Sequence, residues 1–235
     1  MVKLIVLHPG IFHADDAFSA ALLKLLLPGV PQERRNPTPE ELDDPHTLCV
    51  DVGGEFDVRR ANYDHHQKDF VVERDVAEGY GLEGEPNPLA AFGLLWHMFL
   101  EQLEPGRDEE QLFLHQKVDQ LLVRGIDATD CGKAHKHPAS CPSISMAIHW
   151  LNPIGECTKE ARDKAFFNQA VPLAQAVLSG ALARAKDIID GRRVVLKAPV
   201  IEGHMLVLPE FVPWQEHIFE RPDADDLLYI IFPSE

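Results

Sequence analysis

Paired cysteines are missing from this chain. Its four cysteines are Cys49, Cys131, Cys141 and Cys157, and no two of them have the CxxC spacing of a zinc ribbon or a thioredoxin-type site. Long apolar runs are missing as well. None approaches the ~20 residues needed to span a bilayer, and the run in MVKLIVLHPG is too short for a signal-peptide core. We therefore expect a cytoplasmic protein with reduced thiols and no membrane partner.

Basic and aromatic residues are scarce. The chain has 22 Lys and Arg against 38 Asp and Glu, which gives a net charge of −16. A general nucleic-acid binder usually shows a basic footprint, and an acidic protein repels polyanions at long range. A site for phosphate therefore needs local cations. Only 8% of residues are aromatic, so base-stacking platforms have little support from composition.

The first part of the chain alternates between strand-like and helix-like patterns. KLIVLH (residues 3–8) is a continuous apolar run typical of a buried parallel strand. A helix is expected over residues 13–29, with acids in its first turn, and further strands over 47–54 and 61–66. Strand, loop and helix in this order open a βαβ unit, so we expect an α/β fold with a parallel sheet flanked by helices.

The pattern changes after about residue 140. Two helical patterns, 89–103 and 109–127, come before this point, and one long amphipathic helix is expected over 159–190. Short β-like runs follow, namely RVVLKA (193–198), HMLVLP (204–209) and DLLYIIF (226–232). The sequence thus predicts separate domains over residues 1–150 and 151–235.

Histidines and aspartates gather where predicted strands end and helices begin. They are His8, His13 and Asp15, then Asp51, then Asp64, His65 and His66, and finally Asp127. Ligands of open α/β sheets bind outside the carboxyl ends of the strands, so the fold is expected to bring these residues together. Imidazoles with carboxylates suit manganese, iron or zinc, whereas magnesium and calcium prefer oxygen ligands alone. Each residue alone has a plain structural role, such as a helix N-terminal acid or a turn residue. Their joint order favours a metal site.

This ordered set resembles the DHH phosphoesterase superfamily. Within it, HPGIFHADDAFSAALL, VDVGGEFDVRRANYDHHQKDF and VRGIDATDCG are similar to the Myg family of metal-dependent hydrolases, as are SMAIHWLNP and VPWQEHIFE. As in that family, a histidine (His13) stands where the wider superfamily has its first aspartate. Members usually continue beyond YIIFPSE into a glycine-rich segment thought to hold substrate, so the C-terminal part looks truncated by comparison.

The resemblance implies a site for two divalent metal ions, expected to be manganese, in a DHH-type catalytic domain over residues 1–150. One ion would take His8, His13 and Asp51, and the other Asp15, Asp51, His65 and Asp127. Two catalytic roles are also implied: Asp64 would orient an imidazole, and His66 would face the substrate as an acid or a phosphate donor. Residues 151–235 would be a long helix and a partial substrate domain.

Substrate contacts are expected at four further positions. Lys133 and His137 lie in a loop that suits phosphate contact, although a solvated loop fits equally well. Trp214 and His217 would line a substrate cleft by family resemblance. Asp130 is interpreted as a turn residue.

The expected function is that of a manganese-dependent phosphoesterase. The resemblance points to single-stranded RNA or short oligonucleotides, cut from the 3′ end as by an exonuclease. One alternative is a hydrolase of a small phosphate compound, such as pyrophosphate, a nucleotide or a cyclic dinucleotide, which suits the acidic composition better. The other is a non-catalytic metal-binding or regulatory protein.

Overall fold

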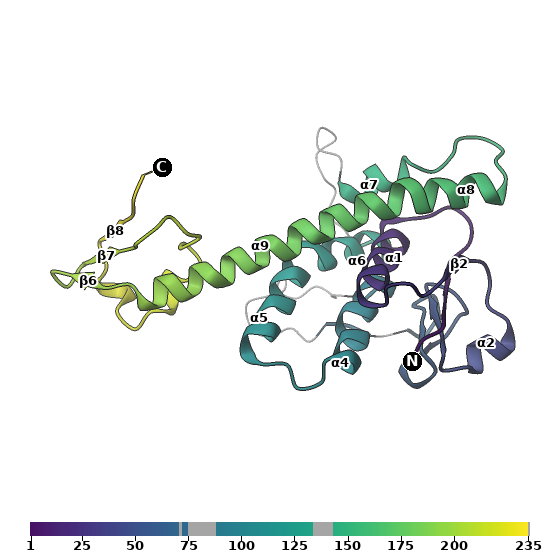
Figure 1. The fold of residues 1–235 in the computed structure, drawn as a ribbon, viewed down its shortest axis with the longest axis horizontal. Coiled ribbons are helices and arrows are strands. Elements are labelled where there is room, and N and C mark those ends of the chain that lie inside the picture. The colour runs from purple at the N-terminus through teal and green to yellow at the C-terminus, as the bar shows by residue number, and fades with distance from the viewer. Residues whose placement is uncertain (71, 75–87, 134–142, 235) are drawn as a thin grey trace. The chain divides into compact units, whose positions relative to one another are not determined.

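The structure, a computed structural model, describes residues 1–70, 72–74, 88–133 and 143–234 (Figure 1). It divides into two compact units. The first contains residues 1–106 and 119–179, and the second residues 107–118 and 180–235. The division expected near residue 150 stays a prediction. Within the described part of the chain, no helix has both the length and the apolar character needed to cross a membrane.

A five-stranded sheet forms the centre of the first unit. Its strands are β1 (Leu4–Leu7), β2 (Gln32–Arg34), β3 (Thr47–Val50), β4 (Phe56–Asp57) and β5 (Asn62–Tyr63), in the order β2-β1-β3-β5-β4. All neighbours are parallel except β4, which runs antiparallel to β5. The fold class is therefore α/β with a mostly parallel sheet flanked by helices, as expected.

Helix α1 (Ala14–Leu26) returns from β1, as the sequence predicts. Every residue from Ala14 to Leu23 is buried, because α1 packs against several other helices. The remaining helices of this unit are α2 (Pro39–Asp43), η1 (Val58–Arg60), α3 (Ala91–Leu94), η2 (Leu95–Phe99), α4 (Leu100–Leu103), η3 (Asp119–Val123), α6 (Arg124–Asp130), α7 (Ile144–His149), α8 (Lys159–Ala165) and η4 (Phe166–Ala170). Of these, α3, α6 and α7 contact α1.

The second unit holds a three-stranded sheet in the order β6-β7-β8. Its elements are α5 (Glu109–Val118), β6 (Val200–Ile201), β7 (Met205–Val207), η5 (Ile218–Glu220), η6 (Ala224–Asp226) and β8 (Tyr229–Ile231), and helix α9 (Val171–Lys197) begins in the first unit and ends here. The helix expected over 159–190 is confirmed, but the strand expected for RVVLKA is wrong. α9 continues to Lys197, because Val195 is buried on its apolar face against Leu206 and Leu208. That packing outweighs the β-preference of two consecutive valines.

Candidate metal centre

Three neighbouring strands of the first unit end at the same level. Leu7 of β1 is paired with Val50 of β3, and Val50 is paired with Tyr63 of β5. The residue that follows each strand is therefore brought to the same edge of the sheet: His8, Asp51 and Asp64. This edge, formed by the carboxyl ends of the strands, is where ligands of open α/β sheets bind. The register explains why residues more than fifty positions apart share one site.

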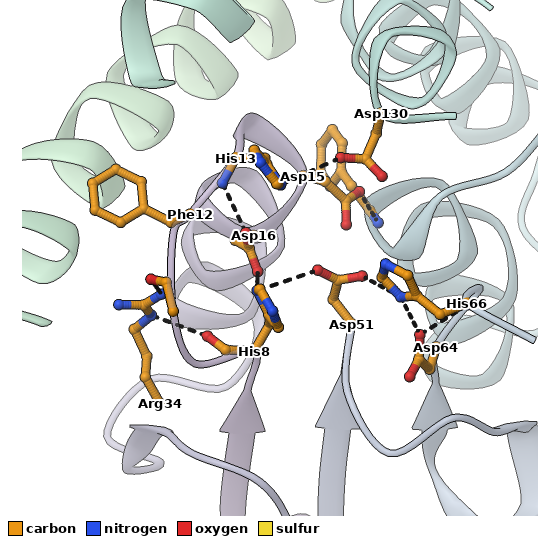
Figure 2. A network of polar contacts seen from close by, with 12 residues as sticks. His8, Phe12, His13, Asp15, Asp16, Arg34, Asp51, Asp64, His66 and Asp130 are labelled. Carbon is orange, nitrogen blue, oxygen red and sulfur yellow. Dashed lines mark hydrogen bonds and ion pairs between the residues drawn. The ribbon is translucent and has the colours of Figure 1, made fainter. Parts of the chain in front are cut away.

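Asp51 stands in the middle of this edge. In Figure 2 it lies between His8 and His66, with a dashed contact to each. Its Oδ2 atom is 4.0 Å from Nδ1 of His8, and its Oδ1 atom is 3.2 Å from Nε2 of His65 and 3.4 Å from Nδ1 of His66. The two oxygens of one carboxylate thus face two different sets of imidazoles, which is the arrangement that a bridging ligand needs.

The backbone of Asp51 supports a functional role. Its φ of 56° lies in the left-handed region, which residues other than glycine seldom adopt. Aspartate tolerates this conformation better than most side chains, but it still costs on the order of 1 kcal/mol or more. The turn places a 5%-exposed carboxylate at the end of β3, directed between its histidine neighbours.

Asp64 orients His66. Its Oδ1 accepts hydrogen bonds from the backbone N–H of His66 at 3.1 Å and from Nδ1 of the same residue at 2.7 Å, and its Oδ2 accepts from the N–H of Gly54 at 2.6 Å. Burial opposes ionisation of Asp64, but these hydrogen bonds outweigh it and lower its pKa. A charged, fixed Asp64 holds the His66 ring with its other nitrogen free to turn outward, and 59% of that side chain is exposed.

The start of α1 supplies the next group of side chains. Asp16 accepts a hydrogen bond from the backbone N–H of His13 at 2.8 Å, and its Oδ1 is 3.5 Å from Nδ1 of His8. Asp15 accepts from the N–H of Phe92 at 2.7 Å through Oδ1. The His13 side chain is 52% exposed, and its Nδ1 lies 4.0 Å from Asp130. The first turn of α1 thus presents two buried carboxylates to the edge of the sheet.

Helix α6 carries two aspartates with different surroundings. Asp130 extends toward α1 (Figure 2), and its Oδ2 is 3.2 Å from Nε2 of His65. Asp127 is fully buried, accepts a hydrogen bond from the N–H of Gly93 at 3.1 Å and is paired with Arg74. Asp130 therefore points into the cluster, whereas the carboxylate of Asp127 is occupied by Arg74 and Gly93.

Among the described residues, three groups have ligand atoms close enough to hold one ion. They are His8, Asp16 and Asp51; Asp51, His65 and His66; and Asp15, His65 and Asp130. Several buried atoms of these groups make no hydrogen bond of good geometry: Nδ1 of His8, Oδ2 of Asp15, Oδ1 of Asp16, Oδ1 of Asp51 and Nε2 of His65. Four of them face one another as carboxylate–imidazole pairs, His8 with Asp16 at 3.5 Å and His65 with Asp51 at 3.2 Å, and Oδ2 of Asp15 has no partner at all. Because a buried polar atom without a partner costs free energy, this concentration fits a cation, and the imidazole and carboxylate donors fit a first-row divalent metal.

The electrostatics point the same way. Burial raises the pKa of Asp51 to about 7 and that of Asp15 well above its usual value, with the neighbouring aspartates adding to the shift at Asp15. At His65, burial favours the neutral ring, but Asp130 and Asp51 outweigh it and raise the pKa. Crowding several carboxylates in a buried place is therefore unfavourable for the protein alone. A divalent cation bound there would relieve the repulsion between them.

The four residues expected to contact substrate lie elsewhere or outside the description. Lys133 is exposed just after α6, and His137 lies outside the described residues. Trp214 packs against the core of the second unit, and His217 is buried there with Nδ1 2.8 Å from Oε1 of Glu220. Their roles stay predictions, as do the metal-binding roles of His13 and Asp127, which belong to none of the three groups.

Sequence reasoning missed three residues. Asp16 and Asp130 join the possible ligand groups, and Arg74 neutralises Asp127. Asp16 could have been found from its position beside Asp15, and Asp130 from its place one helical turn after Asp127. Arg74 carries no local signal, because its partner is 53 residues away in the sequence.

These features define an α/β protein with a cluster of possible metal ligands at the carboxyl ends of parallel strands. The family model MYG1_exonuc, described as "Uncharacterised protein family (UPF0160)", matches residues 4–235, and the chain belongs to this family.

Three relatives illustrate the similarity. The MYG1 exonuclease of Homo sapiens is 32% identical over 90% of this chain, and that of Bos taurus 35% identical over 97%. The MYG1 protein of Dictyostelium discoideum is 24% identical over 94% of this chain and 70% of its own length. The chain spans 61% and 65% of the human and bovine proteins, less than two thirds of each. No solved structure matches the chain.

Proposed function

We propose that this chain is a metal-dependent phosphoesterase of the DHH type that hydrolyses phosphodiester bonds of single-stranded RNA or short oligonucleotides from the 3′ end. The observation that carries the proposal is the crowding of buried carboxylates and imidazoles at the ends of β1 and β3, at the start of α1 and in His65, in groups whose ligand atoms lie close enough to hold an ion. The name exonuclease borne by the human and bovine relatives supports the substrate class.

The residues present divide naturally between two ions, for which manganese is the proposed metal. His8 and Asp16 would hold one, and Asp15, His65 and Asp130 the other. Asp51 would bridge them, because its two oxygens face the two sides of the cluster. When bound, a pair of divalent ions supplies an activated water and neutralises charge on a phosphoryl oxygen.

His66 is the proposed acid or phosphate donor. Its ring is half-exposed, stands beside the cluster 3.4 Å from Asp51, and is held by Asp64. The carboxylate raises the pKa of His66, so the ring keeps a proton at higher pH than a free histidine. A protonated ring at this place can donate a hydrogen bond to a phosphate oxygen or a proton to the leaving group.

A small phosphate compound is the second candidate substrate. The net charge of −16 opposes the approach of a long polyanion, whereas pyrophosphate or a nucleotide needs only the local site. Two divalent ions would balance the four carboxylates of Asp15, Asp16, Asp51 and Asp130, so the site would no longer repel the phosphate of either class of substrate.

The test is hydrolysis of a 3′- or 5′-labelled single-stranded RNA by the purified protein with Mn²⁺ and with EDTA. Metal-dependent shortening of the 5′-labelled strand, one nucleotide at a time, would support the proposal. Hydrolysis of pyrophosphate or nucleotides but not of RNA would favour the second candidate. A protein that binds metal and hydrolyses none of these substrates would be a metal-binding or regulatory protein.

A further inference from the structure

A cavity of about 400 Å³ opens beside the metal centre, within the first unit. Its lining combines the carboxylates of Asp15 and Asp130 with the rings and apolar side chains of His13, Met146, His149 and Trp150. The volume is within the range of ~300–1,000 Å³ that is common for small-molecule sites. The lining thus has a polar wall and an aromatic wall, and each suits a different part of a ligand.

The polar wall is shared with the metal centre. Asp15 and Asp130 line the cavity and also belong, with His65, to one of the possible ligand groups. Asp15 is 1% exposed, and its Oδ2 has no hydrogen-bond partner. A ligand that reaches the group of Asp15, His65 and Asp130 with one end would therefore place its adjoining atoms in the cavity.

The second wall is aromatic and apolar. The rings of His13 and His149 lie nearly parallel, 12° apart, with centroids separated by 6.0 Å. Met146 lies in α7 and Trp150 caps its end, and the backbone N–H of Trp150 donates to the carbonyl oxygen of Met146 at 3.0 Å, so the two residues lie on one side of the helix. They are 46% and 62% exposed. Large apolar side chains left open around a cavity, next to a few polar groups, are typical of a ligand site.

We propose that this cavity holds the nucleobase of the nucleotide whose phosphate lies at the metal centre. The inference rests on the proposed function and narrows it to nucleotide substrates. Flat apolar faces suit a base of any sequence, because every base has a π-face. Ser145, which also lines the cavity, offers a hydroxyl group to the polar edge of a base or a ribose. Thr129 lines it too, and because its hydroxyl donates to the carbonyl oxygen of Gly125 at 2.7 Å, it can act there as an acceptor. A pyrophosphate ion has no part that would use this wall.

The test compares two ligands that differ only in the base. Binding of adenosine 5′-monophosphate and of ribose 5-phosphate to the Mn²⁺-loaded protein is measured by calorimetry. The wild-type protein is compared with Trp150→Ala. Phe219→Ala serves as the matched control, because Phe219 is also exposed and does not line the cavity.

The proposal predicts that the wild-type protein binds the nucleotide at least about five-fold more tightly than the sugar phosphate, the ratio that ~1 kcal/mol of base stacking produces. The ratio should fall toward one in Trp150→Ala and stay high in Phe219→Ala. Equal affinity for the two ligands in the wild type, or an unchanged ratio in Trp150→Ala, would overturn it.

Because the readout is binding, the result does not depend on turnover. If the base is preferred but RNA is not cut, the proposed function fails and the cavity proposal stands. If RNA is cut but the protein binds ribose 5-phosphate as tightly as adenosine 5′-monophosphate, the cavity proposal fails and the proposed function stands.

Discussion

Asn152 and Phe12 form a reciprocal pair of hydrogen bonds across 140 residues of sequence. The backbone N–H of Phe12 donates to Oδ1 of Asn152 at 3.0 Å, and Nδ2 of Asn152 donates to the carbonyl oxygen of Phe12 at 2.8 Å. One side chain thus satisfies both main-chain groups of a fully buried residue. Phe12 lies in the loop between His8 and His13, so this pair fixes the loop that leads to the candidate metal centre.

Replacing Asn152 with alanine should destabilise the protein. The change leaves both main-chain groups of Phe12 without their partner, and each such group costs about 1–3 kcal/mol. Urea denaturation should show a loss of about 2 kcal/mol, together with weaker metal binding because His8 is less well placed. The exposed Asn168 gives a matched control, and its alanine variant should behave as the wild type. Equal midpoints for the two variants would show that the pair contributes nothing.

Arg34 holds the same loop from the side of the sheet. Its side chain is fully buried and donates to the carbonyl oxygens of His8 at 3.1 Å and Gly10 at 2.8 Å, and to Asp163 at 3.0 Å. The guanidinium also lies 4.5 Å from the ring centroid of Phe166. Because it serves three acceptors at once, it fastens the loop to both the sheet and α8.

Arg34→Met should lower the free energy of unfolding by about 3 kcal/mol, since it leaves the carbonyl oxygens of His8 and Gly10 without their charged donor. Arg34→Lys should recover little, because an ammonium group cannot reach three acceptors arranged around a planar fork. Thermal or chemical unfolding measures both variants. Arg59→Met is the control, because that side chain is 91% exposed and its removal should change little. A lysine variant as stable as the wild type would contradict the geometry.

Gly93 is required by the buried Asp127. A Cβ at this position would overlap Oδ2 of Asp127 and approach a methyl group of Leu89 to 2.7 Å. Gly93→Ala should therefore destabilise by about 1–3 kcal/mol through overpacking. Helix propensity alone predicts the opposite sign. Gly125→Ala, in α6 with open space around its Cβ, should stabilise by about 0.5–1 kcal/mol. Chemical denaturation that gave both variants the same sign would argue against this packing.

His66→Ala separates catalysis from metal binding. We expect the variant to retain its metal and to lose about 10²–10⁴-fold in kcat, the range for loss of a general acid. Elemental analysis and RNA hydrolysis measure the two properties on one preparation. His46→Ala, an exposed histidine outside the cluster, should keep both. Loss of metal from His66→Ala would instead make His66 a ligand, as its place beside Asp51 and His65 allows.

The parts of this structure that follow local patterns were predictable from sequence. The apolar run before His8, the helix after His13, and the strand before Asp51 each carry their own periodicity or composition. The parallel sheet then brings their ends together, so His8, Asp15, Asp51 and His65 could be assigned to one edge from the sequence alone.

The parts that depend on distant contacts were not predictable. Asp127 and Asp130 differ only in their surroundings, since Arg74 pairs with the first and His65 approaches the second. The clamps made by Arg34 and Asn152 join residues far apart in the chain and leave no repeating pattern. Val195 has the composition of a strand residue, yet burial against Leu206 keeps it in α9.

The most direct test of the account is the manganese content of the wild-type protein and of Asp51→Asn, measured by elemental analysis after equilibrium dialysis. Asp43→Asn is the control, because that side chain is 75% exposed and lies outside the cluster. The account predicts close to two manganese ions per wild-type and control chain and the loss of most of them from Asp51→Asn, because one carboxylate serves both ions. A wild-type protein without bound metal, or an Asp51→Asn variant with unchanged content, would contradict it.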